Sequence, residues 1–192
     1  MHKSELSVKV FEELDKLPKG YITLITVNAN NYLRVNLQIL KFLCNDKGLQ
    51  GIYVSINRPY SSSIKILKGN GIETDNIFFV DCISVLLGDT PFRTAKCLFT
   101  SPENLTDVAV LIDQWVRSLP EGDKFLFLDS LSTLLIYNSV GTVTKFSHFI
   151  TGKMRQWGLN GVLMSVEKES SPEILDDISQ FCDRRINLGG EL

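Results

Sequence analysis

An acidic residue and a serine directly follow one of the most apolar runs in the chain. Phe125 to Leu128 are all apolar, and Asp129 and Ser130 come next. Such a run is too short for a helix and is typical of a strand buried on both faces of a parallel sheet. Ligands of open α/β sheets bind beyond the carboxyl ends of the strands, where a carboxylate can hold magnesium through water. Taken alone, the pattern favours the alternative that Asp129 is an ordinary strand-end cap.

A second segment has the residue types that bind single-stranded nucleic acid. Residues 145–157 read KFSHFITGKMRQW, and aromatic rings beside cations can stack on bases. Phe146, Phe149 and Trp157 recur at helical spacing, however, which favours a helix that packs on the sheet. The charged and titratable residues expected in water on this helix are Lys145, His148, Lys153 and Arg155. Ser165 and Glu167 end a later apolar run near the same crevice, where a capping or solvated role is expected.

The bulk properties of the chain are those of a folded domain and exclude several classes of protein. With 192 residues, 44% of them hydrophobic, the chain can bury a full core. A formal charge of -2 gives no general attraction to nucleic acid or to anionic membranes, so a nucleic-acid role would need a local basic patch. No apolar stretch approaches the roughly 18 residues that span a bilayer, which predicts a cytoplasmic protein without a membrane partner.

The cysteines and histidines give no sign of a metal site. The four cysteines are scattered without a CxxC pair, and the two histidines show no zinc-ligand spacing. We therefore expect Cys44, Cys82, Cys97 and Cys182 to be reduced and mostly buried thiols.

Strand-like and helix-like segments alternate along the chain. Apolar runs predict strands at residues 21–27, 51–56, 77–80, 125–128, 161–166 and 185–188. Apolar residues at helical spacing predict helices at 6–17, 105–119, 143–157 and 174–181, with Ser101 capping the second and Ser171 the last. A shorter helix is expected to begin at Pro59 with the serines 61–63 as its capped start, and to end near Gly69 and Gly71.

One segment is ambiguous between strand and helix. In residues 33–43, LRVNLQILKFL, the apolar residues alternate like a strand, yet Leu33, Leu37, Leu40 and Cys44 form a helical stripe. The segment is long for a strand, so a helix is favoured. The regular alternation indicates a mostly parallel sheet covered on both faces. Without a repeat or linker, the chain is expected to be one domain, 1–192, with an N-terminal helix in 1–17 and a core from 20 to 192.

Several segments together resemble the KaiC-like branch of the RecA-fold P-loop ATPases. They are FLFLDSLSTLL at 125–135, GIYVSINRPYSSSIKILKGNGIETDNIFFVD at 51–81 and CDRRINL at 182–188. The segments SPENLTD at 101–107 and DSLSTLLIYNSVGTVTKFSHF at 129–149 are similar to small archaeal KaiC-like proteins of unassigned role. The resemblance covers nearly the whole chain after Lys19. It implies a three-layer α/β domain of RecA/KaiC type, in which Asp129 and Ser130 take the place of the second nucleotide motif.

The chain departs from this family in the phosphate-binding loop. The family's first strand runs into GxxxxGK[ST], whose glycines let backbone amides wrap the phosphates while the lysine contacts the terminal phosphates. Residues 28–34 here read NANNYLR, without glycine, lysine, serine or threonine. Side chains at the former glycine positions crowd the phosphate space, although asparagine tolerates left-handed backbone angles. The loop is one residue shorter and puts Tyr32 or Leu33 at the lysine position, while Arg34 is expected in solvent.

A second departure follows the second strand. The family places a carboxylate pair there to activate water, whereas this chain has Asn57 and Arg58, and asparagine cannot act as a general base. We therefore expect no catalytic residue and no resident metal, with Asp129 accepting hydrogen bonds from backbone amides of the altered loop. The residues assigned to this degenerate nucleotide pocket are Asn28, Asn30, Asn31, Tyr32, Arg34, Asn57, Asp129 and Ser130.

Three functions remain open from the sequence. The first is a non-catalytic KaiC/RecA-like protein that acts in a regulatory role through a protein partner or by self-association. The second is an atypical nucleotide binder, in which the asparagine-rich loop and Asp129 hold ATP with magnesium weakly. The third is a recombination-mediator-like module on DNA, against which the negative net charge counts. The resemblance also implies that Arg184 and Arg185 could reach a neighbouring subunit, although surface arginines are the ordinary case.

Overall fold

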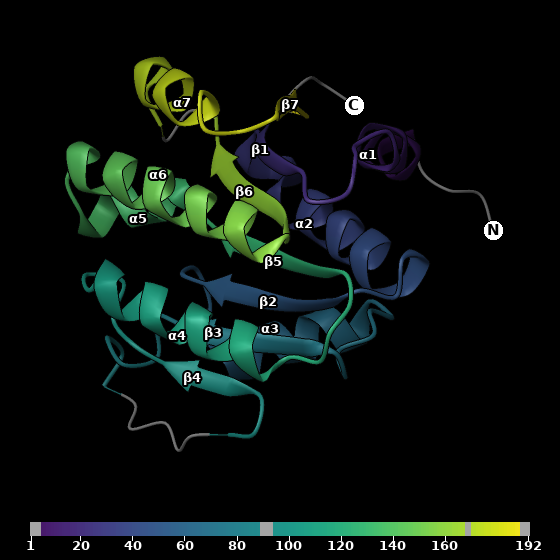
Figure 1. Cartoon of the computed structure of the whole chain (residues 1–192), viewed down its shortest axis with the longest axis horizontal. Coiled ribbons are helices and arrows are strands. Elements are labelled where there is room, and N and C mark those ends of the chain that lie inside the picture. The colour runs from purple at the N-terminus through teal and green to yellow at the C-terminus, as the bar shows by residue number, and fades with distance from the viewer. Residues whose placement is uncertain (1–4, 89–93, 168–169, 189–192) are drawn as a thin grey trace.

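A single parallel sheet forms the centre of the molecule (Figure 1). The structure is a computed structural model that describes residues 5–88, 94–167 and 170–188. Its seven strands are ordered β4-β3-β2-β5-β6-β1-β7, and every neighbouring pair is parallel. The strands are β1 (Ile22–Val27), β2 (Gln50–Ser55), β3 (Ile77–Asp81), β4 (Cys97–Phe99), β5 (Lys124–Asp129), β6 (Asn160–Val166) and β7 (Arg184–Asn187). The predicted parallel sheet is thereby confirmed.

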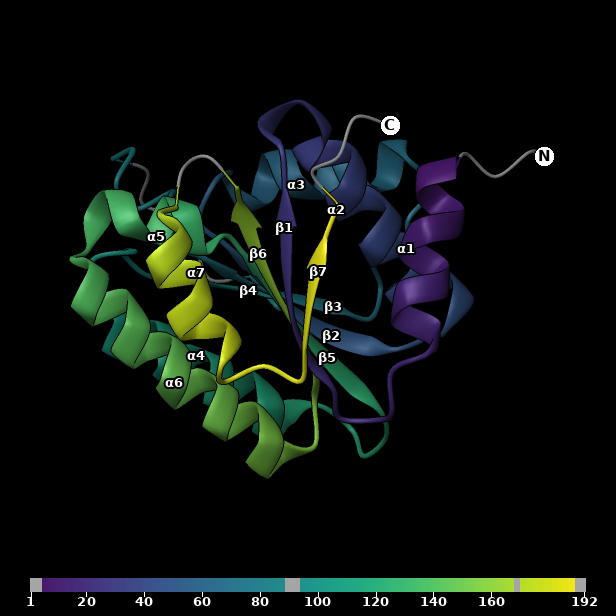
Figure 2. The ribbon, with the colours of Figure 1, turned by 90° about the horizontal axis from the view of Figure 1, so that it is seen from above.

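Helices cover both faces of this sheet, which gives the predicted three layers (Figure 2). One face carries α1 (Glu5–Asp15), α2 (Tyr32–Lys41) with its π-helical continuation η2 (Phe42–Asp46), and α3 (Tyr60–Gly69). The other carries α4 (Leu105–Ser118), α5 (Leu131–Tyr137), α6 (Val140–Trp157) and α7 (Pro172–Ser179). The ambiguous segment at 33–43 is helical, because its buried residues Val35, Ile39 and Leu40 face the sheet on one side.

The run Phe125 to Leu128 is apolar throughout because β5 lies at the centre of the sheet and contributes to two cores. Phe125 and Phe127 pack with the residues of α1, α2 and α3, and Leu126 and Leu128 pack with those of α4 to α7. All four side chains are fully buried. A strand with polar residues on one face would leave one of these helix layers without a surface to pack on.

Three details differ from the sequence-based expectations. Helix α4 is capped by Asn104, whose side chain accepts from the amide of Asp107, and Ser101 instead accepts from Glu103 within a turn. That turn is held by Asn138, which donates to the Pro102 carbonyl. The serines 61–63 lie inside the first turn of α3 and do not cap it. Strand β4 and helix α5 were not predicted, because three and seven residues are too short for a periodic signal.

The described residues contain free thiols and no membrane-spanning helix. Cys44, Cys82 and Cys97 are buried as predicted, and Cys182 is partly exposed. No helix in the described ranges is long and apolar enough to cross a bilayer. No cluster of three or more potential metal ligands from His, Cys, Asp or Glu occurs within 5–88, 94–167 and 170–188 either.

Candidate functional site at the end of strand β5

The candidate site lies where β5 and β2 end side by side. The strand register places Tyr53 opposite Phe127 and Ser55 opposite Asp129. Asp129 is the last residue of β5 and only 1% exposed. Ser130 follows as the cap of α5 and accepts from the amide of Thr133 at 3.3 Å. The strand therefore delivers the carboxylate to the expected edge of the sheet, but into a buried position.

The carboxylate of Asp129 is occupied by three side-chain donors. Its Oδ1 accepts from the hydroxyl of Tyr32 and from Nδ2 of Asn57, the latter at 2.6 Å. Its Oδ2 accepts from the hydroxyl of Tyr53. A carboxylate has about four acceptor positions, so most of its capacity is used inside the protein. A magnesium ion would have to displace these donors to reach Asp129.

The expectation that backbone amides of the loop would hold Asp129 is wrong. Residues Ala29–Asn31 form a short 3-10 helix, η1, in which the amide of Asn31 bonds to Asn28 and the following amide of Tyr32 to the Ala29 carbonyl. Asn28 caps this turn, because its side-chain oxygen accepts from the amide of Asn31 at 2.9 Å. Asparagine is among the residues that make such caps best, which explains how a loop without glycine still turns tightly. The loop thus closes on itself and leaves Asp129 to side chains.

Tyr32, and not Leu33, points into the site. Tyr32 begins α2 and is 8% exposed, whereas Leu33 is 38% exposed. Asn30 is exposed, and so is Arg34, for which no carboxylate of the described residues lies within salt-bridge distance. The solvent-facing position predicted for Arg34 is confirmed. The inward side chain at the start of α2 is therefore an uncharged phenol that contacts the acid of β5.

Asn57 connects the carboxylate to helix α5. Its Nδ2 donates to Asp129, and its Oδ1 accepts from the hydroxyl of Thr133. Both ends of the amide are thus used. A carboxylate at this position could still accept from Thr133, but it could not donate to Asp129, since a carboxylate has no hydrogen to donate. Arg58 contributes its carbonyl, which accepts from Ser55. Asn57 is therefore a structural bridge between Asp129 and Thr133 of helix α5.

Two members of this cluster were missed in the sequence: Tyr53 and Thr133. Tyr53 lies in the middle of β2, where a tyrosine reads as one more apolar strand residue. Its hydroxyl meets Asp129 only because β2 and β5 are neighbours in a fixed register. Thr133 lies three residues after the cap of the unpredicted helix α5. Neither the contact of Tyr53 with Asp129 nor the position of Thr133 can therefore be predicted from the neighbouring sequence.

Burial and the charge of Asp129 keep both phenols protonated. Burial raises the pKa of Tyr32 and of Tyr53 well above 10, and the nearby negative charge of Asp129 raises both further. Each hydroxyl is therefore a hydrogen-bond donor at neutral pH and not a base. The arrangement holds an acid in place.

The raised pKa of Tyr53 predicts a pH dependence of stability. The protonated Tyr53 hydroxyl contributes fully to the free energy of unfolding below about pH 10, where the unfolded tyrosine is also protonated. This contribution is lost as the pH rises toward the pKa of Tyr53 in the folded protein. Wild type should therefore lose up to about 1.4 kcal/mol per pH unit more than Tyr53→Phe above pH 10. Urea unfolding of both proteins at pH 8 and pH 11 measures the difference. Equal losses in the two proteins would contradict the assignment.

The other candidate residues contact neighbouring side chains elsewhere in the fold. Ser165 lies 2.9 Å from the hydroxyl of Ser170, and Glu167 accepts from Asn187 at 2.9 Å. Arg184 lies 3.7 Å from Glu13, and Arg185 pairs with Asp176 at 2.5 Å. The ring of His148 packs on Phe181.

The expectation that the aromatic residues of 145–157 pack on the sheet holds only in part. Phe146 is buried, but Phe149 is 50% exposed and Trp157 is partly exposed. Val143, Ile150 and Met154 already fill the sheet-facing side of α6. The remaining aromatic rings lie beside this stripe, on the side of α6 that faces α4.

The fold is that of a KaiC-like, RecA-fold domain. The chain is similar to KaiC-like protein PH0186 from the hyperthermophilic archaeon Pyrococcus horikoshii OT3, with a TM-score of 0.59 and 14% identity over 84% of this chain and 69% of that chain. It is also similar to the uncharacterized protein PH0321 from Pyrococcus horikoshii, solved in complex with an unknown peptide, with a TM-score of 0.69 and 14% identity over 94% and 82%. Neither a family model nor a curated protein matches the sequence.

Proposed function

We propose that this chain is a KaiC/RecA-fold protein that does not hydrolyse nucleotides and acts in a regulatory role, by binding a protein partner or by self-association. The observation that carries this proposal is the state of Asp129. Its carboxylate accepts from Tyr32, Tyr53 and Asn57 in a site that is almost closed to solvent. The acid that would face magnesium in an ATPase is thus part of the protein's own packing.

The surroundings of Asp129 support the same conclusion. A nucleotide site needs a cation for the phosphates and a group that activates water. At the start of α2 the inward residue is Tyr32, and after β2 the residue that contacts Asp129 is Asn57. Neither side chain carries a charge at neutral pH. Binding of a peptide is a property of the neighbour PH0321, and it agrees with a fold of this kind serving as a binding module.

A thermal-shift titration with ATP and magnesium tests the loss of nucleotide binding. A ligand at about 100 times its dissociation constant stabilises a protein by about 2.7 kcal/mol, which for a chain of this size is about 5–10 °C in melting temperature. We expect a shift of less than about 1 °C at 5 mM ATP with 10 mM magnesium. Magnesium alone and ATP with EDTA are the controls. A saturable shift that requires both components would overturn the proposal in favour of an ATP-binding role.

Light scattering after size exclusion separates the two routes of action. A mass that rises with concentration between about 1 and 100 µM would indicate self-association, and a constant monomer mass would direct the search to a different protein. If the chain stays monomeric and retains no stoichiometric partner in affinity purification, neither self-association nor binding of a protein partner would be supported, and the proposed function would be contradicted.

A further inference from the structure

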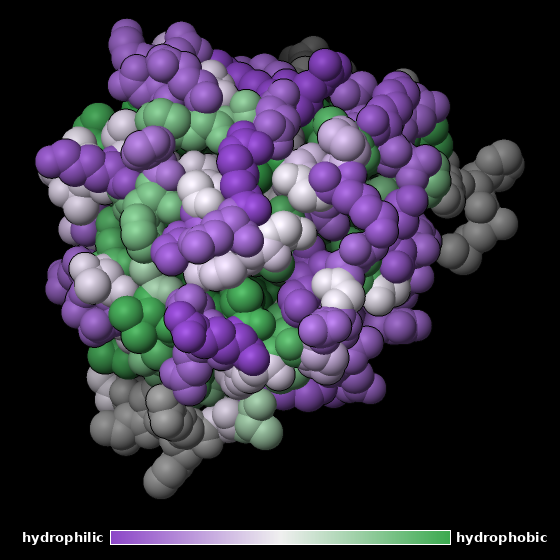
Figure 3. All heavy atoms as spheres, viewed as in Figure 1, coloured by the Kyte–Doolittle hydropathy of each residue, from purple (hydrophilic) through white to green (hydrophobic). Residues whose placement is uncertain are grey.

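A groove lies between α4 and α6, on the outer side of the second helix layer. Its volume is about 570 Å³, and it is lined by residues from both helices. Figure 3 shows hydrophobic residues reaching the surface in this region, with hydrophilic side chains around them. The apolar lining residues are Leu105, Ala109, Val110, Phe146, Phe149 and Trp157. None of them belongs to the cluster around Asp129, whose tyrosines face the other helix layer.

Two of these residues expose large apolar side chains. Val110 is 58% and Phe149 is 50% exposed, and they project from opposite walls of the groove. Phe149 is followed at helical spacing by Lys153 and Trp157, so the wall on α6 is a continuous stripe. The lining residues on α4 run from Leu105 to Arg117, which at 1.5 Å per residue is about 18 Å. That length matches a helix of three to four turns.

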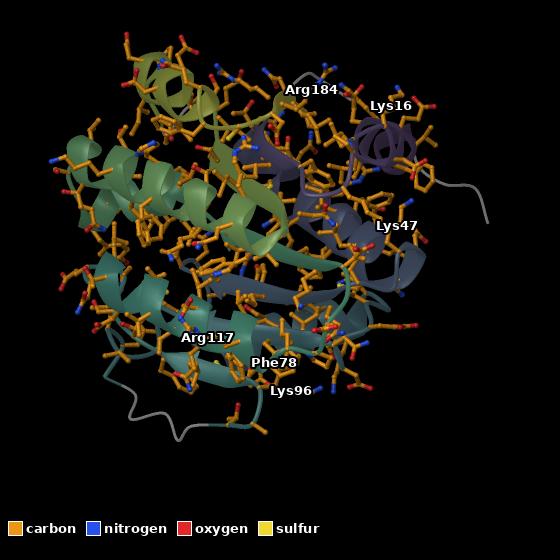
Figure 4. The ribbon with its side chains drawn as sticks, in the orientation of Figure 1. Lys16, Lys47, Phe78, Lys96, Arg117 and Arg184 are labelled. Carbon is orange, nitrogen blue, oxygen red and sulfur yellow. The ribbon has the colours of Figure 1, made fainter. Side chains whose placement is uncertain are left out.

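The charges of the groove are unbalanced. On the α4 wall, Asp113 and Arg117 pair with each other at 2.6 Å, and Arg117 extends along the surface of α4 (Figure 4). On the α6 wall, Lys153 donates to Gln156, and its Nζ lies 5.7 Å from the centroid of the Trp157 ring. Within the described part of the chain, neither Lys145 nor Lys153 has a carboxylate within 4.0 Å. Two positive charges therefore flank the groove on a chain whose net charge is -2.

We propose that this groove docks an amphipathic helix of a partner protein, with an apolar stripe on Val110, Phe149 and Trp157 and acidic residues toward Lys145 and Lys153. The occupant follows from the groove's length, its two helical walls and its charge. A two-fold contact with a second copy would bring the same face, with its unpaired lysines, against itself. The inference rests on the proposed function, because it names the kind of partner that such a protein would bind.

Designed peptides provide the test. The probe is a fluorescein-labelled 15-residue helix with leucines at positions i, i+3, i+4 and i+7 and glutamates on both flanks. Its counterpart has lysines in place of the glutamates, and a scrambled peptide has the same composition. Fluorescence anisotropy at 150 mM salt should give at least tenfold tighter binding of the glutamate peptide than of either control. Binding no tighter than that of the scrambled peptide would overturn the proposal.

Two variants locate the binding on the protein. Phe149→Asp should weaken binding of the glutamate peptide at least tenfold. Ile136→Asp places the same charge at a 73% exposed apolar residue outside the groove and should leave peptide binding unchanged. The double variant Lys145→Glu and Lys153→Glu should reverse the preference toward the lysine peptide. Equal effects of Phe149→Asp and Ile136→Asp, or no reversal, would contradict the assignment. Circular dichroism checks that the variants remain folded.

The same samples separate this proposal from competing ones. A dimer in light scattering that Phe149→Asp converts to a monomer would assign the groove to a second copy and overturn the partner-helix proposal. An ATP-dependent thermal shift would contradict the proposal that the protein does not bind nucleotides. The result of the peptide experiment would still stand. Absence of peptide binding with no ATP shift would remove the groove as the docking site and leave the non-catalytic proposal standing.

Discussion

Replacing Asp129 with alanine is expected to lower the free energy of unfolding by about 3–5 kcal/mol in the absence of any ligand. The substitution leaves the hydroxyls of Tyr32 and Tyr53 and the amide of Asn57 without their acceptor, in a site where Asp129 itself is 1% exposed. Buried donors without a partner each cost about 1–3 kcal/mol. Urea unfolding at pH 7 and 25 °C, with magnesium removed by EDTA, measures the effect.

The sign of this effect separates a structural acid from a metal ligand. A carboxylate kept only to bind magnesium is an uncompensated charge in the empty protein, so its removal would be neutral or stabilising. Asp129→Asn, which keeps the shape and one acceptor oxygen, should cost less than the alanine variant. Asp176→Ala is a suitable control, because it removes a surface pair with Arg185 and should cost no more than about 1 kcal/mol. A neutral or stabilising Asp129→Ala would contradict the role assigned to the cluster.

The second large effect is expected from Gly51→Ala, at about 2–3 kcal/mol of destabilisation. A Cβ atom built on Gly51 lies 2.1 Å from the ring of Phe125, its neighbour across the β2–β5 pair. Phe125 is fully buried, so its ring has no free space to enter. This contact matters for the site because the same two strands carry Tyr53 and Asp129. Chemical denaturation gives the loss directly.

A second substitution should rescue this defect in part. Phe125→Leu removes the ring atoms nearest Gly51, so the double variant should be more stable than the sum of the two single losses predicts, by about 1 kcal/mol or more. Gly152→Ala is the matched control, since nothing lies within 4 Å of a Cβ there and the residue is exposed in the middle of α6. That change should stabilise the protein by about 0.5–1 kcal/mol. Additive losses at Gly51 and Phe125 would mean that the ring is not the obstacle.

Most of the sheet could be predicted from the sequence, because its strands are short apolar runs and its helices have strong periodicity. The strand at 125–128, the helix at 143–157 and the cap at Ser171 follow from local patterns and are confirmed. The cap of α4 could not be predicted in this way. Ser101 and Asn104 are both good caps, and local sequence does not choose between them. In the structure Asn104 is the cap, and Asn138, which is distant in sequence, donates to the Pro102 carbonyl in the intervening turn.

The candidate site was predictable in its position and not in its contacts. The apolar strand with a terminal acid places Asp129 at the strand ends, as the parallel sheet requires. Its partners come from the start of α2, from β2 and from the segment between β2 and α3, and which of these meet depends on strand order and register. The side chain of Asn28 caps η1 by accepting from the amide of Asn31. This role can be recognised in the sequence only when residues 29–31 are known to form a helical turn.

The two-sided use of the Asn57 amide has a consequence for substitutions in this cluster. An acid at position 57 would remove the donor to Asp129 and place a second negative charge against it, while its oxygen could still accept from the Thr133 hydroxyl. A lysine introduced at position 32 alone would lose the phenol contact while Tyr53 and Asn57 still hold the carboxylate. Each of these single substitutions is therefore expected to lower the free energy of unfolding. Because Tyr32, Asn57 and Asp129 contact one another, a charge introduced at one of these positions is expected to need compensating changes at the others.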